Sequence, residues 1–85
     1  MGSYRIFIKP SAAKEIEAIP PRDRQRIVAR IQGLSADPRP TGSEKLSGLD
    51  KFRLRQGAYR IVYSVTDDDS SVLIVKVGHR KDVYR

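Results

Sequence analysis

The 85-residue sequence contains no cysteine and only one histidine. The absence of cysteine excludes disulfide bonds and thiolate metal ligands, and nothing favours an oxidising compartment. A single histidine excludes a two-histidine ribonuclease mechanism. No apolar run approaches the roughly 20 residues of a membrane-spanning helix, and the N-terminus lacks the apolar segment of a signal peptide. The sequence therefore predicts a soluble, cytoplasmic protein with one domain over residues 1–85, which uses neither a metal nor another cofactor.

Acidic residues are scarce relative to basic ones. The chain has 17 Lys and Arg against 10 Asp and Glu, which gives a net charge of +7, and no acid occurs between Lys51 and Tyr63. Such a charge attracts polyanions, and an acidic protein or an anionic membrane would be attracted in the same way. Basic residues that are scattered along the chain need serve only solubility. The arginine-rich cluster indicates more, because guanidinium groups are well suited to binding phosphate.

The region from residue 51 to residue 84 has the alternation of strands that are buried on one face. Phe52 and Leu54 are predicted to point into a core, and the basic residues of opposite parity are predicted to point outward together. A short Gln-Gly-Ala connection folds the second strand back beside the first. The resulting hairpin would gather four basic residues on one face of the sheet: Lys51, Arg53, Arg55 and Arg60. We therefore predict an anion site there, with a polyphosphate as its ligand.

The N-terminal half predicts a short strand over residues 4–8 and then two helices. Ser11 is the expected N-cap of the first helix. Pro20 and Pro21 end this helix and begin the next, because proline is tolerated in the first turn of a helix. The second helix is predicted to bury one apolar stripe, which consists of Ile27, Val28, Ile31 and Leu34.

This order of elements predicts an α+β fold with a small antiparallel sheet of about four strands. The sheet consists of the N-terminal strand and a three-strand meander, and the two-helix hairpin packs on one of its faces. Residue parity places the arginine cluster on the open face of the sheet. The segment from His79 to Tyr84 is expected to curl over that face.

Two sequence patterns carry a family resemblance. The first is F-R-L-R-x-G-x-Y-R-I-V-Y from Phe52 to Tyr63, and the second is V-G-H-R-K-D-V-Y from Val77 to Tyr84. Together with the order of the N-terminal elements, they resemble the RelE/ParE superfamily of toxins from type II toxin–antitoxin modules. The basic residues and the tyrosine near the C-terminus are similar to those of the RelE branch. RelE-type toxins are ribosome-dependent endoribonucleases that cut mRNA in the decoding site.

The resemblance also implies individual roles. The positions that would engage the scissile phosphate, together with the terminal tyrosine, are Lys51, Arg53, Arg60, Arg80 and Tyr84. The positions that would contact RNA around them are Arg55, His79 and Lys81. The implied partners are an acidic cognate antitoxin and a ribosome with mRNA in its decoding site. A membrane and a small-molecule cofactor are not expected.

RNA can be cleaved without a metal when a ribose 2′-OH attacks the adjacent phosphate. This reaction needs charge stabilisation, a proton acceptor and a proton donor. Arginine stays protonated, so the arginines predict electrostatic stabilisation rather than base catalysis. Lys51 is a candidate acid, and Tyr84 is a candidate for either a base or a stacking platform. His79 is equally compatible with a surface role and with proton transfer.

Two other functions remain open. A ParE-like protein would bind and inhibit DNA gyrase without performing chemistry. A non-catalytic RNA-binding module would use the same basic surface. The predicted set of basic residues with Tyr84 favours the metal-independent endoribonuclease.

Overall fold

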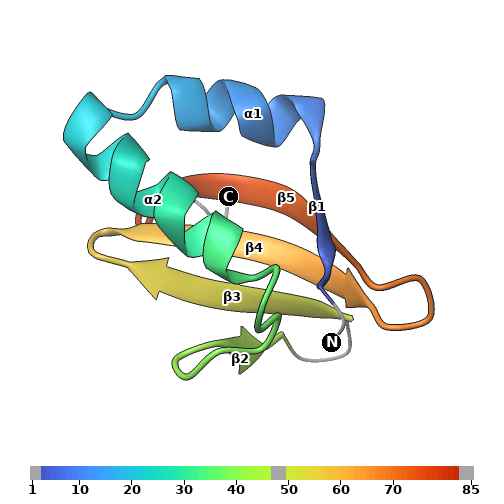
Figure 1. Cartoon of the computed structure of the whole chain (residues 1–85). Helices are drawn as coiled ribbons and strands as arrows, with labels where there is room; N and C mark the ends of the chain where they lie inside the picture. Colours follow the sequence, from blue (N-terminus) through green and yellow to red (C-terminus); the bar gives the residue numbers. More distant parts are fainter. Residues whose placement is uncertain (1–2, 47–49, 83–85) are drawn as a thin grey trace.

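The computed structural model describes residues 3–46 and 50–82. Both helices lie on the same side of one sheet, and the other face of the sheet carries no helix in this part of the chain (Figure 1). The predicted α+β class and the helix pair on one face are thus confirmed. The elements in chain order are β1 (Arg5–Ile8), α1 (Pro10–Glu17), α2 (Pro21–Gly33), β2 (Glu44–Lys45), β3 (Lys51–Gln56), β4 (Tyr59–Thr66) and β5 (Ser71–His79).

The sheet differs in detail from the prediction. It has five strands in the order β1-β5-β4-β3-β2, rather than about four. It is also mixed, because β1 pairs with β5 in parallel and the other pairs are antiparallel. The added strand β2 has only two residues, Glu44 and Lys45, which is too short to give a periodic signal. Strands β3, β4 and β5 form the predicted meander.

Proline sets the helix boundaries. Pro10 and Pro21 occupy the first turns of α1 and α2, where a missing N–H costs nothing. The predicted cap Ser11 is wrong, because Lys9 is the N-cap residue and Ser11 already lies within α1. Val28 was expected in the buried stripe of α2, but it is 36% exposed. No helix in the described residues is long and apolar enough to cross a membrane.

The core lies between the helices and the sheet. From α2 it receives Ile27 and Ile31, which are buried with Leu54 and Ile61 of the hairpin. Tyr63 is also fully buried, and its hydroxyl donates a hydrogen bond of 2.8 Å to the carbonyl of Pro38. This bond satisfies a polar group that would be costly to bury alone. It fixes the loop that follows α2 against β4.

Candidate nucleic-acid interface on the open face

The β3–β4 hairpin places four basic residues on the face of the sheet that the helices leave uncovered. Leu54 lies opposite Ile61, and both are fully buried beneath the helices. Directly opposite residues share a face, and neighbours along a strand alternate. The basic residues of opposite parity therefore lie on the open face, about 7 Å apart along β3. We call this surface the cationic face, and it is formed by Lys51, Arg53, Arg55 and Arg60.

Arg55 and Arg60 lie directly opposite one another at the end of the hairpin. The connection is Gly57-Ala58, and Gly57 has a φ of +59°. A positive φ at the first central residue is typical of a type II′ turn, which matches the twist of the flanking strands. Glycine adopts this φ without steric cost. The turn thus brings two guanidinium groups to one end of the cationic face.

The Arg60 side chain is held in place at this turn. It is 9% exposed, and its Nη1 donates to the carbonyl of Tyr59 at 3.0 Å and to that of Gly57 at 3.3 Å. Carbonyl acceptors fix the direction of the guanidinium group and leave its charge unneutralised. This is the arrangement that favours an anion next to a preoriented cation.

Arg80 reaches the same end of the sheet from another element. It follows β5 directly, and its backbone N–H donates to the carbonyl of Ala58 at 2.8 Å. Because Arg60 lies opposite Gly78, this bond continues the β4–β5 ladder with the same parity. Arg80 therefore joins Arg55 and Arg60 near the turn, and the neighbouring Lys81 is exposed.

Two of the predicted site residues, His79 and Tyr84, are not placed on the cationic face. His79 lies opposite Tyr59 with their rings edge to face, 5.7 Å apart between centroids, and this pair has the parity of the helix-covered side. Its Nδ1 accepts a hydrogen bond of 3.2 Å from the backbone N–H of Lys81. The structure therefore does not bring His79 onto the cationic face. Tyr84 lies outside the described residues, so its predicted position stays a prediction.

Arg53 has an acidic partner that the sequence did not indicate. Glu44 on β2 lies opposite Arg53 in the register, and the two side chains form an ion pair. The stretch from Lys51 to Tyr63 lacks acids, but the edge strand supplies one from outside it. A two-residue strand leaves no signal in the sequence, which explains why this partner was missed. Glu44 thus places a carboxylate beside one guanidinium group of the cationic face.

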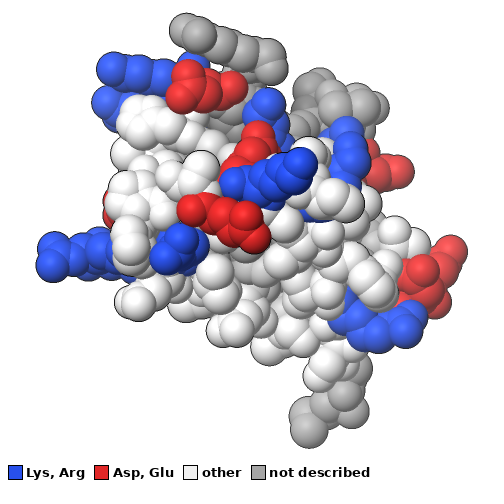
Figure 2. All heavy atoms as spheres, turned by 90° about the horizontal axis from the view of Figure 1, so that it is seen from above, with Lys and Arg blue, Asp and Glu red and all other residues white. Residues whose placement is uncertain are grey.

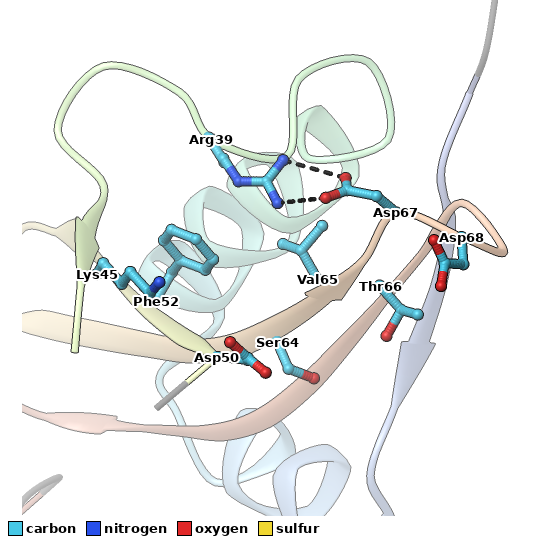
Figure 3. A pocket seen from close by; sticks show the side chains of 9 residues that line it. All are labelled: Arg39, Lys45, Asp50, Phe52, Ser64, Val65, Thr66, Asp67 and Asp68. Carbon is cyan, nitrogen blue, oxygen red and sulfur yellow. Dashed lines mark hydrogen bonds and ion pairs between the residues drawn. The ribbon is translucent and has the colours of Figure 1, made fainter. Parts of the chain in front are cut away.

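A second polar cluster lies in a hollow of about 610 Å³ near the other end of the hairpin. Figure 3 shows Arg39 and Asp67 facing each other across its rim, with Phe52 on the Arg39 side. Arg39 donates two hydrogen bonds to Asp67, of 2.8 and 3.2 Å, and Tyr4 donates a third of 2.7 Å. The Arg39 guanidinium also lies 5.3 Å from the centroid of the Phe52 ring. The sequence indicated only an acidic turn here, because these partners come from distant segments.

These contacts shift the ionisation of the cluster. The hydrogen bonds from Arg39 and then from Tyr4 hold the pKa of Asp67 below its ordinary value. The same bond to Asp67 raises the pKa of Tyr4. Both shifts favour the charge states that bind each other. The cluster therefore joins the residue before β1, the loop after α2 and the β4–β5 turn.

The helix-covered side has a different charge pattern. In Figure 2, which looks down on the helices, Lys and Arg form separate groups, and Asp and Glu lie beside several of them. A broad uncharged area separates these groups. Among the described residues, no group of His, Asp and Glu could hold a metal ion. The helix-covered side therefore carries cations as well, but in this view acids lie beside several of them.

The sequence has relatives among known proteins that match it over almost its whole length. A family model described as the ParE toxin of the type II toxin–antitoxin system parDE matches residues 6–84. Toxin RelG of Mycobacterium tuberculosis is 33% identical over 86 residues, which cover 96% of this chain and 97% of the relative.

Solved structures of toxin–antitoxin complexes contain chains with the same fold. The archaeal RelE–RelB complex from Pyrococcus horikoshii contains a chain that is 28% identical, with a TM-score of 0.81 and coverage of 95% of this chain and 99% of that one. The intact RelBE toxin–antitoxin complex of Escherichia coli contains a similar chain, with 28% identity, a TM-score of 0.78 and coverage of 91% and 96%. The protein described here belongs to the RelE/ParE family of toxins from type II toxin–antitoxin systems.

Proposed function

We propose that this toxin is a ribosome-dependent, metal-independent endoribonuclease that cleaves mRNA. The observation that supports the proposal is the strand register, in which the backbone positions of Arg55, Arg60 and Arg80 lie near the same end of the sheet. Three guanidinium groups, from β3, from β4 and from the residue after β5, suit a phosphate whose charge increases during reaction. The names of the related toxins, RelG and RelE, support the same branch of the family.

The proposed reaction is attack of a ribose 2′-OH on the adjacent phosphate. The 2′-oxygen forms a bond to phosphorus, the bond to the 5′-oxygen breaks, and a 2′,3′-cyclic phosphate and a 5′-hydroxyl result. Arg60 and Arg80 stabilise the extra negative charge on the phosphoryl oxygens. Arg53 joins them when the phosphate displaces Glu44. Lys51 and Tyr84 are the proposed groups for proton transfer, and Tyr84 is alternatively a stacking platform for a base.

The proposal includes a protein partner. Related RelE toxins have been solved in complex with RelB antitoxins. We expect an acidic antitoxin that covers the cationic face, because the net charge of +7 favours a partner of opposite sign. Such a partner would exclude RNA from the same surface.

A cleavage assay on ribosomes programmed with a defined mRNA tests the function. The variants Arg60→Ala and Arg80→Ala are each expected to reduce the cleavage rate by about 10²–10³-fold, by analogy with the removal of one oxyanion-hole donor. Arg26→Ala, an exposed residue of α2, is the matched control and is expected to cleave at the wild-type rate. Thermal unfolding of every variant verifies that the fold is retained.

The same preparation distinguishes the ParE-like alternative, which the matching family model favours. Inhibition of supercoiling by DNA gyrase, with the programmed mRNA left intact, would overturn the endoribonuclease proposal. Binding of RNA with neither cleavage nor gyrase inhibition would also overturn it, and would leave a non-catalytic RNA-binding module.

A further inference from the structure

Phe7 is a large aromatic residue that the fold leaves exposed. Its side chain is 49% exposed, and its cross-strand neighbour Leu73 is 37% exposed. Ile6 and Ile74, which alternate with them, pack in or against the core. Phe7 and Leu73 therefore lie on the open face. We call these two residues the Phe7 patch.

The register of the sheet connects the Phe7 patch with the cationic face. Phe7 lies opposite Leu73, Leu73 opposite Ser64, and Ser64 opposite Lys51. These four residues form one row across β1, β5, β4 and β3. At the usual spacing between strands the row is about 14 Å long. An extended ligand of a few nucleotides would span it.

The surroundings of Phe7 carry positive charge as well as apolar surface. The guanidinium of Arg5, two residues earlier on the same face of β1, lies 5.7 Å from the centroid of the Phe7 ring. On the next row, Lys76 of β5 lies opposite Val62, and Val62 lies opposite Arg53. An aromatic ring with cations around it is the combination that binds single-stranded nucleic acids, because bases stack and phosphates pair.

We infer that Phe7 is a stacking platform for an unpaired base of the RNA whose backbone lies on the cationic face, with Arg5 contacting a phosphate beside that base. This inference rests on the proposed function, since it takes RNA as the ligand. A purely apolar partner would gain from Phe7 and Leu73 but would have to desolvate Arg5 and Lys76. A single RNA strand satisfies both kinds of group.

The direct test is photocrosslinking with a short single-stranded RNA. The RNA is 2′-O-methylated so that it resists cleavage, and 5-iodouridine is placed at successive positions. In the wild-type protein, one position is expected to crosslink to Phe7, as mapped by mass spectrometry. Loss of stacking in Phe7→Ala is expected to weaken RNA binding about fivefold to a hundredfold.

Two further variants separate stacking from general hydrophobic contact. Phe7→Tyr is expected to keep wild-type affinity, and Phe7→Leu is expected to lose most of it, although both retain apolar bulk. Ile8→Ala removes a side chain that is 43% exposed on the opposite, helix-covered side, and is expected to bind RNA as the wild type does. Equal affinity in Phe7→Leu and wild type, or a crosslink elsewhere than Phe7, would overturn the inference.

The outcome can be kept apart from that of the proposed function. Cleavage of mRNA on programmed ribosomes is measured with the same variants. If the wild type cleaves and Phe7→Ala binds and cleaves equally well, the stacking platform is wrong and the endoribonuclease stands. If the wild type does not cleave but crosslinks through Phe7, the endoribonuclease is wrong and the RNA site stands.

Discussion

Asp67 illustrates how single residues link distant segments of this small fold. It accepts hydrogen bonds from Arg39 in the loop after α2 and from Tyr4, the residue before β1. Its pKa is lowered, chiefly by the Arg39 hydrogen bonds and next by Tyr4. A carboxyl group whose pKa is lower in the folded state stabilises the fold above its unfolded pKa of about 4, and this stabilisation is lost as the pH falls through the folded value.

This linkage gives a prediction for Asp67→Asn. At neutral pH the variant is expected to have a smaller free energy of unfolding than the wild type, because the ion pair is lost. Below about pH 4 the difference is expected to shrink, since the wild-type carboxyl group also becomes neutral. Urea denaturation of both proteins between neutral and acidic pH measures this difference. A difference that stays constant across the whole range would show that the charge of Asp67 does not contribute.

At the scale of elements, the β3–β4 turn depends on one glycine. Gly57 has φ +59°, and no atom lies within 4 Å of the position that a Cβ would occupy. A substitution there is therefore opposed by backbone conformation alone. Gly33, the last residue of α2, has equally free space and no positive φ. These two glycines form a matched pair.

Alanine at the two positions is expected to have opposite effects. Gly57→Ala should lower the free energy of unfolding by about 1–2 kcal/mol, because a left-handed conformation is unfavourable for alanine. Gly33→Ala should raise it by up to about 1 kcal/mol, because alanine is the better helix former. Urea denaturation measures both values. Equal effects of the two substitutions would contradict a conformational role for Gly57.

The sequence predicted the elements whose signal is local. Alternation along β3 and β4 located the hairpin, and parity placed its basic residues on the open face. Pro20 and Pro21 marked the boundary between the helices. The ion pair of Glu44 with Arg53 was not predicted, because it depends on which strand lies at the edge of the sheet.

Other features were missed for the same reason. The exposure of Val28 and the parallel pairing of β1 depend on how the elements pack, and that arrangement leaves no local pattern. The N-cap at Lys9 is local: Pro10 begins α1 one residue before the predicted cap Ser11. The functional roles of the basic residues came from the family resemblance rather than from spacing, and they remain predictions.

At the scale of the molecule, the net charge of +7 predicts that RNA affinity falls as salt increases. If the strand lies on the cationic face, removing one phosphate contact should reduce the slope of log affinity against log salt by about 0.7. This reduction is expected for Lys51→Ala and for Arg55→Ala.

The variant Arg26→Ala has the same change in net charge but alters the helix-covered side. It is expected to keep the wild-type slope. Fluorescence anisotropy with a labelled single-stranded RNA over a range of salt concentrations measures the slope for each variant. Equal reductions in all three variants would mean that RNA binds through general charge rather than through the cationic face.

The pairing of β1 with β5 has a consequence for how the toxin is made. The first strand to be synthesised has its only neighbour in the described sheet in the last strand. Contacts between such distant parts of a chain carry a large loop-closure entropy cost, which slows folding. During translation the emerging N-terminal strand must wait unpaired, and the sheet is completed only when β5 has left the exit tunnel. A toxin with a complete sheet therefore cannot form before β5 has been synthesised and released from the tunnel.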